Sequence, residues 1–159
     1  MTISVGDTLP QATLTKVTAD GPEPVDTAEY FKGRRVAVFA VPGAFTPTCS
    51  ARHLPGYVEK QEELKGKGID EVVCTSVNDP FVLGAWSKSA GADGITMLAD
   101  GNGTFAEALG LDMDGSKFGL GQRGQRLTAQ LELTGVQHAG MLPRPRRLWA
   151  IVRVLPVRE

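Results

Sequence analysis

Short runs of consecutive apolar residues alternate along the chain with longer segments in which apolar residues recur every three or four positions. The runs at 36–41, 71–77 and 95–99 lack the strict apolar–polar alternation of a half-exposed strand, which is typical of buried central strands. Between these runs the spacing predicts helices over 48–66 and 79–89, the second opened by an Asp-Pro pair. Strands that alternate with helices in this way predict an α/β fold with parallel central strands.

Proline, glycine and capping residues refine these helices and the loops between them. Pro55 lies inside the first helix, where a kink is expected because proline has no N–H to donate. Thr104 and Glu107 have the spacing of a capping box, which predicts a short helix over 104–109. The glycine-rich stretch 112–124 predicts a loop.

The two ends of the chain are less regular. The first thirty residues are rich in turn formers, with a short helix expected over 26–31. Residues 127–133 and 136–142 predict two strands joined by a turn at Thr134-Gly135, which adds antiparallel pairs and makes the expected central sheet mixed. The spacing over 148–155 favours a final amphipathic helix, with a strand as the alternative.

Composition narrows the classes of protein. The 159 residues suit one domain, expected to span 1–159. Lys and Arg number 17 against 18 Asp and Glu, and this net charge of -1 argues against nucleic-acid binding. The apolar runs are far shorter than the roughly 20 residues of a membrane span, and no basic and apolar leader opens the chain. We therefore expect no nucleic-acid partner, no membrane partner and a cytoplasmic location.

Two motifs that match by letter fail in their context. Residues 119–124 spell the glycine pattern of a dinucleotide site, but a loop is expected before them and a strand after them. Cys49, His53, Cys74 and His138 are residue types that bind zinc, but they lack the paired spacing of a zinc site. The sequence therefore predicts no cofactor and no metal ion.

Cys49 lies where a reactive thiol is expected. The buried strand ends near Val41, a turn follows, and Cys49 falls in the first turn of the next helix, where unpaired N–H groups and the helix dipole favour a thiolate. Three residues earlier, the Thr46 hydroxyl can turn towards the sulfur and donate to the thiolate or to a bound oxygen. Pro42 can shield the sulfur without offering a competing N–H. The alternative is that Cys49 is a small apolar residue packed at a helix start.

The residues around Cys49 resemble those of peroxiredoxins. Pro42-x-x-x-Thr46-x-x-Cys49 is the active-site signature of that family. The longer strings are similar to the peroxiredoxin 5 subfamily, with its plant type II and bacterial members, and the resemblance covers about residues 3–126. These strings are Val41-Pro42-Gly43-Ala44-Phe45-Thr46-Pro47-Thr48-Cys49-Ser50, His53-Leu54-Pro55-Gly56, Ser76-Val77-Asn78-Asp79-Pro80-Phe81-Val82, Leu98-Ala99-Asp100-Gly101 and Arg123-Gly124-Gln125-Arg126.

The resemblance implies a thioredoxin-like fold and a thiol peroxidase that reduces hydrogen peroxide and alkyl hydroperoxides. It implies that Cys49 is the peroxidatic cysteine, whose thiolate attacks a peroxide oxygen and becomes sulfenic acid. It further implies that Thr46 holds the thiolate and the peroxide, and that the fixed charge of Arg126 stabilises the negative charge that moves onto the leaving oxygen. The alternative function is a non-enzymatic redox sensor or thioredoxin-fold adaptor switched by oxidation of Cys49.

Cys74 follows Cys49 by 25 residues and is the second of only two cysteines. Plant type II members have a cysteine at this spacing, and the resemblance implies that it resolves the sulfenic acid as a disulfide. Its position in a predicted buried strand supports a structural role equally well. Either Cys74 or an external thiol, glutathione with glutaredoxin or thioredoxin, then has to reset the enzyme.

Three further residues are candidates for the pocket. Phe45 is implied to make a subunit contact, as in the homodimers of the family. His53, one helical turn after Cys49, either faces the pocket or lies on the helix surface. Trp86 matches a family tryptophan beside the active site, although plain core packing explains it as well.

The last part of the chain departs from the family pattern. Residues 127–159 are atypical, because polar residues interrupt the expected strands and a basic, proline-rich stretch occupies 143–147. We expect this stretch to be a solvated linker rather than a contact site for an acidic partner.

Overall fold

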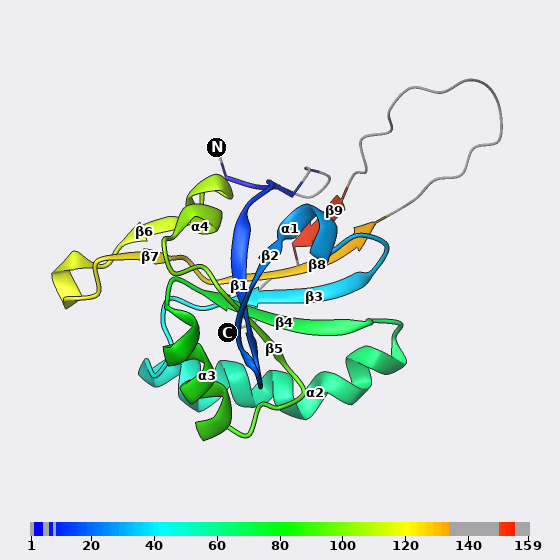
Figure 1. Cartoon of the computed structure of the whole chain (residues 1–159), viewed down its shortest axis with the longest axis horizontal. Helices are drawn as coiled ribbons and strands as arrows, with labels where there is room; N and C mark the ends of the chain where they lie inside the picture. The colour runs from blue at the N-terminus through cyan, green and yellow to red at the C-terminus, as the bar shows by residue number, and fades with distance from the viewer. Residues whose placement is uncertain (1, 5–6, 8, 134–149, 155–159) are drawn as a thin grey trace.

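The computed structural model describes residues 2–4, 7, 9–133 and 150–154 (Figure 1). The strands are β1 (Thr13–Thr18), β2 (Gly21–Asp26), β3 (Arg35–Ala40), β4 (Glu71–Ser76), β5 (Thr96–Ala99), β6 (Asp112–Asp114), β7 (Gln122–Gly124), β8 (Leu127–Leu133) and β9 (Ala150–Val154). The helical elements are α1 (Thr27–Tyr30), the π-helical turn η1 (Cys49–His53), α2 (Leu54–Gly66), α3 (Pro80–Ser89), α4 (Thr104–Ala108) and the 3-10 turn η2 (Ser116–Phe118).

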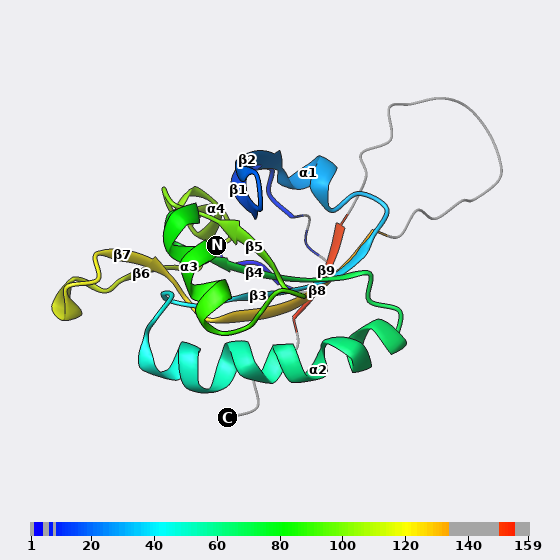
Figure 2. The same cartoon turned by 60° about the horizontal axis from the view of Figure 1, so that its bottom comes forward.

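A seven-stranded mixed sheet in the order β2-β1-β5-β4-β3-β8-β9 forms the centre of the described structure. Its three middle strands, β5, β4 and β3, run parallel, while β1 and β8 flank them antiparallel. In Figure 2, α2 lies along one side of this sheet and α1 on the other. The predicted α/β fold, a central mixed sheet flanked by helices, is therefore confirmed, as are the three buried central strands.

Residues along the central strands alternate between two separate cores, one on each face of the sheet. On β4, Val73 joins the core that includes Phe31 of the α1 side, whereas Val72 and Cys74 join the core that includes Trp86 of α3. Both cores are apolar because helices cover both faces, which is why these strands are nearly continuous apolar runs. The second core is the one to which Cys49 also belongs.

The helix predicted over 48–66 forms, but with a π-helical turn in place of a kink. The N–H of Leu54 donates to the carbonyl of Cys49, a five-residue separation that widens the turn. Pro55 then falls in the first turn of α2, where the missing N–H costs nothing. The wider turn accommodates the proline at the start of α2.

The helix predicted after the Asp-Pro pair is confirmed in detail. Asp79 caps α3 by accepting from the N–H groups of Phe81 and Val82 at 2.9 Å each, and Pro80 is its first residue. The helix over 104–109 also forms as α4, but the predicted capping box is wrong. The carboxylate of Asp100 takes the place of Thr104 by accepting from the N–H of Ala106 at 2.8 Å.

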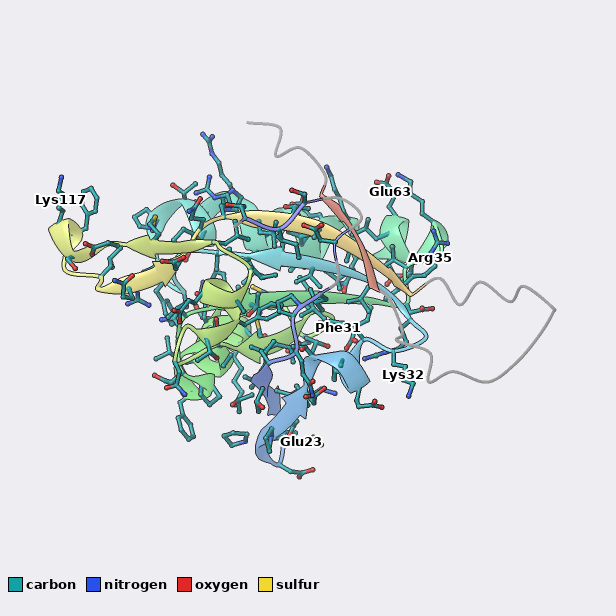
Figure 3. The ribbon with its side chains drawn as sticks, turned by 90° about the horizontal axis from the view of Figure 1, so that it is seen from above. Glu23, Phe31, Lys32, Arg35, Glu63 and Lys117 are labelled. Carbon is teal, nitrogen blue, oxygen red and sulfur yellow. The ribbon has the colours of Figure 1, made fainter. Side chains whose placement is uncertain are left out.

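Two stretches expected to be loops or turns form hairpins. The stretch 112–124 is not a plain loop, because β6 and β7 pair as an antiparallel hairpin closed by η2. Figure 3 shows Lys117 on this hairpin, which projects from one end of the molecule, with Arg35 at the other end. Near the start of the chain, the short helix predicted over 26–31 is confirmed as α1, but the turn-rich residues before it form the hairpin of β1 and β2. Side-chain alternation does not reveal this hairpin because prolines occupy β2.

At the end of the chain, the alternative prediction of a strand is the one observed. Residues 150–154 form β9, which pairs antiparallel with β8. The predicted turn at 134–135, the strand over 136–142 and the basic stretch 143–147 lie outside the described residues. That residues 1–159 form a single domain stays a prediction. No helix in the described part of the chain is long and apolar enough to cross a membrane.

Candidate active site

The candidate site lies at the end of the sheet where the parallel strands β3 and β4 terminate. In Figure 1, the loop after β3, the start of η1, helix α3 and the β6–β7 hairpin all lie at the same, left-hand end of the molecule. The carboxyl ends of neighbouring parallel strands meet at one edge, so residues far apart in sequence are collected here. This is where the structure brings together the loop that carries Thr46 and the helix start that carries Cys49.

The loop after β3 holds the Thr46 hydroxyl in a fixed direction. The hydroxyl of Thr46 donates to the carbonyl of Gly43 at 2.8 Å, and the carbonyl of Thr46 accepts the N–H of Ser50 at 3.0 Å as the first helical hydrogen bond. A hydroxyl has one proton and two lone pairs, so the bond to Gly43 leaves the Thr46 oxygen as an acceptor. Thr46 can therefore accept a hydrogen bond from a small molecule beside Cys49.

Cys49 is the first residue of the π-helical turn, and its side chain is almost fully buried. It is 1% exposed and belongs to the apolar core that also contains Phe39 of β3 and Cys74 of β4. The thiol thus combines a helix start with apolar surroundings.

Trp86 ties helix α3 to the residue that follows Cys49. Its indole N–H donates to the hydroxyl of Ser50 at 3.0 Å, and its ring is 1% exposed within the same apolar core. Both interpretations of Trp86 from the sequence are therefore compatible with its position: it packs in the core and lies next to the cysteine. Ser50 is a neighbour that sequence reasoning did not single out.

Cys74 lies in the middle of β4 and is fully buried. Both cysteines are free thiols. Burial raises the pKa of the Cys74 thiol, and the negative charge of a nearby Cys49 thiolate raises it further. The two sulfurs are therefore close enough to interact electrostatically, but the Cys74 thiol stays protonated and is a weak nucleophile in the folded protein.

His53 lies one helical turn beyond Cys49 and experiences the positive charge of Arg126. The pKa of His53 is lowered, first because the ring is half-buried and second because of the positive charge of Arg126. The buried Nδ1 of His53 has no hydrogen-bond partner among the described residues. Arg126 is exposed, whereas the His53 side chain is partly buried with its Nδ1 directed inward.

Pro42 and Phe45 occupy the loop between β3 and η1. Pro42 is half-buried directly after the strand, whereas Phe45 is 54% exposed and has a left-handed backbone with φ of 59°. A phenylalanine in this region is strained, and such strain persists only where neighbouring contacts hold the chain. Two other large apolar side chains, Phe81 and Phe118, are also exposed.

Three residues that sequence reasoning did not assign to the site hold this loop in place. Asn78 Oδ1 accepts from the N–H of Ala44 at 2.9 Å, and the Ser76 hydroxyl lies 2.9 Å from the carbonyl of Val41. The guanidinium of Arg123 donates to the carbonyl of Val77 at 2.6 Å. Ser76, Asn78 and Arg123 all stand within strings that resemble the family, which is the only signal in the sequence that marks them.

Comparison with known proteins identifies the family. A family model described as Redoxin matches residues 4–129. Peroxiredoxin-2E-2, chloroplastic, of Oryza sativa subsp. japonica is 52% identical over 79% of this chain and 58% of its own length. Peroxiredoxin-2B of Arabidopsis thaliana is 45% identical over 82% of both chains. The chain belongs to the peroxiredoxin family. Peroxiredoxins are thiol peroxidases, and the recognition made from the sequence is confirmed.

A solved structure gives the same result at the level of the fold. The reduced peroxiredoxin Prx3 of Vibrio vulnificus, in complex with hydrogen peroxide, is 48% identical, with a TM-score of 0.79 over 82% of each chain. This likeness confirms the thioredoxin-like fold of this peroxiredoxin.

The comparisons contradict the cytoplasmic location expected from the sequence. Relatives such as the rice protein are named chloroplastic. The expectation was wrong because it rested on missing targeting and membrane signals, and an absence of signals does not identify a compartment.

The titration of His53 offers a test of where Arg126 lies. Since the pKa of His53 is below its ordinary value of 6.5, the ring is neutral at pH 7, and the folded state loses stability as the pH falls below that value. Arg126→Met removes a positive charge that opposes protonation, so the pKa of His53 should rise. Proton NMR of the imidazole Cε1–H measures the pKa of His53, and the variant His138→Gln assigns its signal. An unchanged pKa in Arg126→Met would show that Arg126 does not lie near His53.

Proposed function

We propose that this chain is a thiol peroxidase that reduces hydrogen peroxide and alkyl hydroperoxides with Cys49 as its peroxidatic cysteine. The observation that carries the proposal is the placement of Cys49: a nearly buried thiol at a helix start, three residues after a hydroxyl held as an acceptor. A merely structural cysteine would need no oriented hydroxyl beside it. The name of the Vibrio vulnificus relative records hydrogen peroxide bound to a protein of this fold, which also supports the proposal.

The proposed chemistry is a displacement at oxygen. The Cys49 thiolate attacks the terminal oxygen of the peroxide, a sulfur–oxygen bond forms as the oxygen–oxygen bond breaks, and the leaving oxygen takes up a proton to give water or an alcohol. The sulfur is oxidised to sulfenic acid and the peroxide is reduced. Thr46 accepts a hydrogen bond from the peroxide hydroxyl because its own proton is engaged by Gly43.

Arg126 and Pro42 complete the proposed site. The guanidinium of Arg126 would stabilise the negative charge that develops on the leaving oxygen, and its electrostatic effect on His53 supports a place near the helix start. Pro42 offers no N–H to compete for the thiolate. His53, Trp86 and Phe45 are proposed to line the pocket rather than to take part in the chemistry.

For the reset of the enzyme we propose an external thiol. Cys74 is fully buried, and its raised pKa keeps it protonated, so attack on the Cys49 sulfenic acid would need local opening of the fold. Glutathione with glutaredoxin, or thioredoxin, would instead supply a reactive thiolate from solvent and release water from the sulfenic acid once local opening exposes Cys49, which is 1% exposed in the folded protein. Cys74 remains a resolving cysteine only in a locally opened state.

We also propose that the chain forms a homodimer, with its interface at the end of the molecule that carries the candidate site. Phe45, Phe81 and Phe118 are all exposed, and exposed aromatic side chains are common in protein interfaces. Phe81 lies in the first turn of α3 and Phe118 lies on η2 in the hairpin, two elements at the end of the molecule where the loop of Phe45 lies (Figure 1). The partner copy would then cover side chains beside the candidate site.

Oxidation of the reduced protein by peroxide tests both the role of Cys49 and the proposed reset by an external thiol. Addition of one equivalent of hydrogen peroxide to the reduced protein should give a sulfenic acid at Cys49, trapped by dimedone and located by mass spectrometry of peptides. The same oxidation should occur in Cys74→Ser, and glutathione with glutaredoxin or thioredoxin should reverse it. A Cys49–Cys74 disulfide as the main product would contradict the external reset.

Native mass spectrometry of the same protein counts the chains in the assembly. A monomer at every concentration would contradict the dimer.

A reaction of Cys49 with hydrogen peroxide no faster than that of free cysteine would sink the peroxidase proposal. The redox sensor or adaptor would then be favoured if oxidation of Cys49 changed the binding of a partner without catalytic turnover.

A further inference from the structure

The loop that carries Thr46 is held by side chains from two other parts of the chain. Asn78 follows β4 and Arg123 lies in β7, whereas the loop itself follows β3. The three segments meet at Gly43, which is buried. A methyl group built on Gly43 would lie 3.1 Å from Thr46 Cγ2, 3.9 Å from Asn78 Oδ1 and 4.0 Å from Arg123 Nη1.

Asn78 makes the direct contact with the loop. Its Oδ1 accepts from the N–H of Ala44 at 2.9 Å and lies 2.8 Å from the hydroxyl of Ser76, which also lies 2.9 Å from the carbonyl of Val41. One amide oxygen thus joins the end of β4 to the residue that directly follows Gly43. The backbone of the loop is thereby fixed to the end of β4.

Arg123 fixes the segment on which Asn78 stands. Its Nη1 donates to the carbonyl of Val77, directly before Asn78, at 2.6 Å, and its Nε donates to the carbonyl of Leu120 at 2.7 Å. The guanidinium therefore bridges the β6–β7 hairpin and the turn after β4. Arg123 supports Asn78 rather than the thiol itself.

The strained backbone of Phe45 shows that the loop needs such support. Phe45 stands between Ala44, which Asn78 holds, and Thr46, whose hydroxyl and carbonyl are both engaged. A left-handed phenylalanine is strained and persists only where the surroundings over-determine it. Without the bond to Ala44, the loop can relax, and the Gly43 carbonyl then no longer fixes the direction of the Thr46 hydroxyl.

We infer that Asn78 is a positioning residue for peroxide reduction: its side-chain oxygen holds the turn at Gly43 and Ala44 so that the Thr46 hydroxyl faces the peroxide as an acceptor. This inference rests on the proposed peroxidase function. It assigns Asn78 no contact with the peroxide, because the side chain acts through the backbone of Ala44.

Two variants at the same position separate the acceptor oxygen from the volume of the side chain. Asn78→Leu keeps a similar volume and removes the acceptor, whereas Asn78→Asp keeps an oxygen that can accept from Ala44. Asn102→Ala, on an exposed turn after β5, is the control for loss of a loop asparagine. Thermal unfolding of each variant shows that the protein compared is folded.

The readout compares two reactions of Cys49 in the same protein. The second-order rate with hydrogen peroxide, measured by stopped flow, depends on the direction of the Thr46 hydroxyl. The rate of alkylation by chloroacetamide, followed by mass spectrometry of the Cys49 peptide, depends on the thiolate and on access to it. We expect Asn78→Leu to lower the peroxide rate about 10- to 100-fold, since a displacement of the order of 1 Å can cost this much, and not to lower the alkylation rate. Asn78→Asp should recover most of the peroxide rate, and Asn102→Ala should match the unaltered protein.

Two results would overturn the inference. In the first, Asn78→Leu reacts with peroxide within about threefold of the unaltered protein. In the second, the peroxide and alkylation rates fall in parallel, which would show an effect on the thiol itself rather than on the orientation of Thr46. Failure of the proposed function looks different, because the unaltered protein would then react with peroxide no faster than free cysteine.

Discussion

Cys49→Ser is expected to reduce peroxide consumption to the background rate, a loss of more than about 10³-fold. The thiolate is the nucleophile, and a serine hydroxyl at the same place is far too weakly acidic to replace it. Steady-state consumption of hydrogen peroxide with glutathione and glutaredoxin, or with thioredoxin, measures the loss. The substitution exchanges sulfur for oxygen in a nearly buried position and leaves the rest of the helix start unchanged.

Cys74→Ser is the matched control for this prediction, because it makes the same chemical change at the other cysteine. The first oxidation of Cys49 should proceed at its usual rate in that variant. The hydroxyl of a serine in the fully buried centre of β4 has to lose its hydration, so the free energy of unfolding should fall, by about 1–3 kcal/mol. Substantial peroxide consumption by Cys49→Ser would show that another residue carries the reaction.

The central part of the fold was predictable from the sequence because local signals and burial agree there. The runs that became β3 and β4 are apolar on both faces, and the structure covers both faces with helices. Asp79 and Pro80 open α3 as their types predict. Asp79 and Pro80 also belong to one of the strings that resemble the peroxiredoxin family.

Other elements depend on pairing that no local pattern reveals. Each strand of the β6–β7 hairpin has three residues, too few to show alternation of apolar and polar positions. Strand β2 contains two prolines, so its sequence is typical of a turn rather than of a strand. The cap of α4 comes from Asp100 across the loop rather than from the neighbouring Thr104, because a carboxylate already fixed at the end of β5 reaches the same N–H groups.

The candidate site was predictable as a set of residues but not as an arrangement. The spacing of Pro42, Thr46 and Cys49 marks the loop and the helix start. It does not show that the Thr46 proton is donated to Gly43, which turns a predicted donor into an acceptor. Nor does it show that Asn78 holds the loop from another strand end, since this contact joins residues 34 positions apart.

Removal of the Thr46 hydroxyl is expected to have the second largest effect on the reaction. Thr46→Val keeps the branched shape of the side chain but removes the acceptor for the peroxide hydroxyl and the bond to Gly43. We expect the second-order rate with hydrogen peroxide to fall about 10²- to 10³-fold, the range found when one preorganised hydrogen-bonding group is removed from an active site. Stopped-flow measurement of Cys49 oxidation, without any reductant, isolates this step.

Thr46→Ser and Thr48→Val provide the comparison. Serine keeps the hydroxyl, so Thr46→Ser should retain most of the rate, whereas Thr48 is exposed, makes no capping hydrogen bond and should tolerate valine without loss. If Thr46→Val and Thr48→Val were equally active, the hydroxyl of Thr46 would have no part in the reaction. Because the bond to Gly43 stabilises the loop as well, thermal unfolding should detect a loss of about 1 kcal/mol in Thr46→Val, too small to explain a hundredfold lower rate by unfolding.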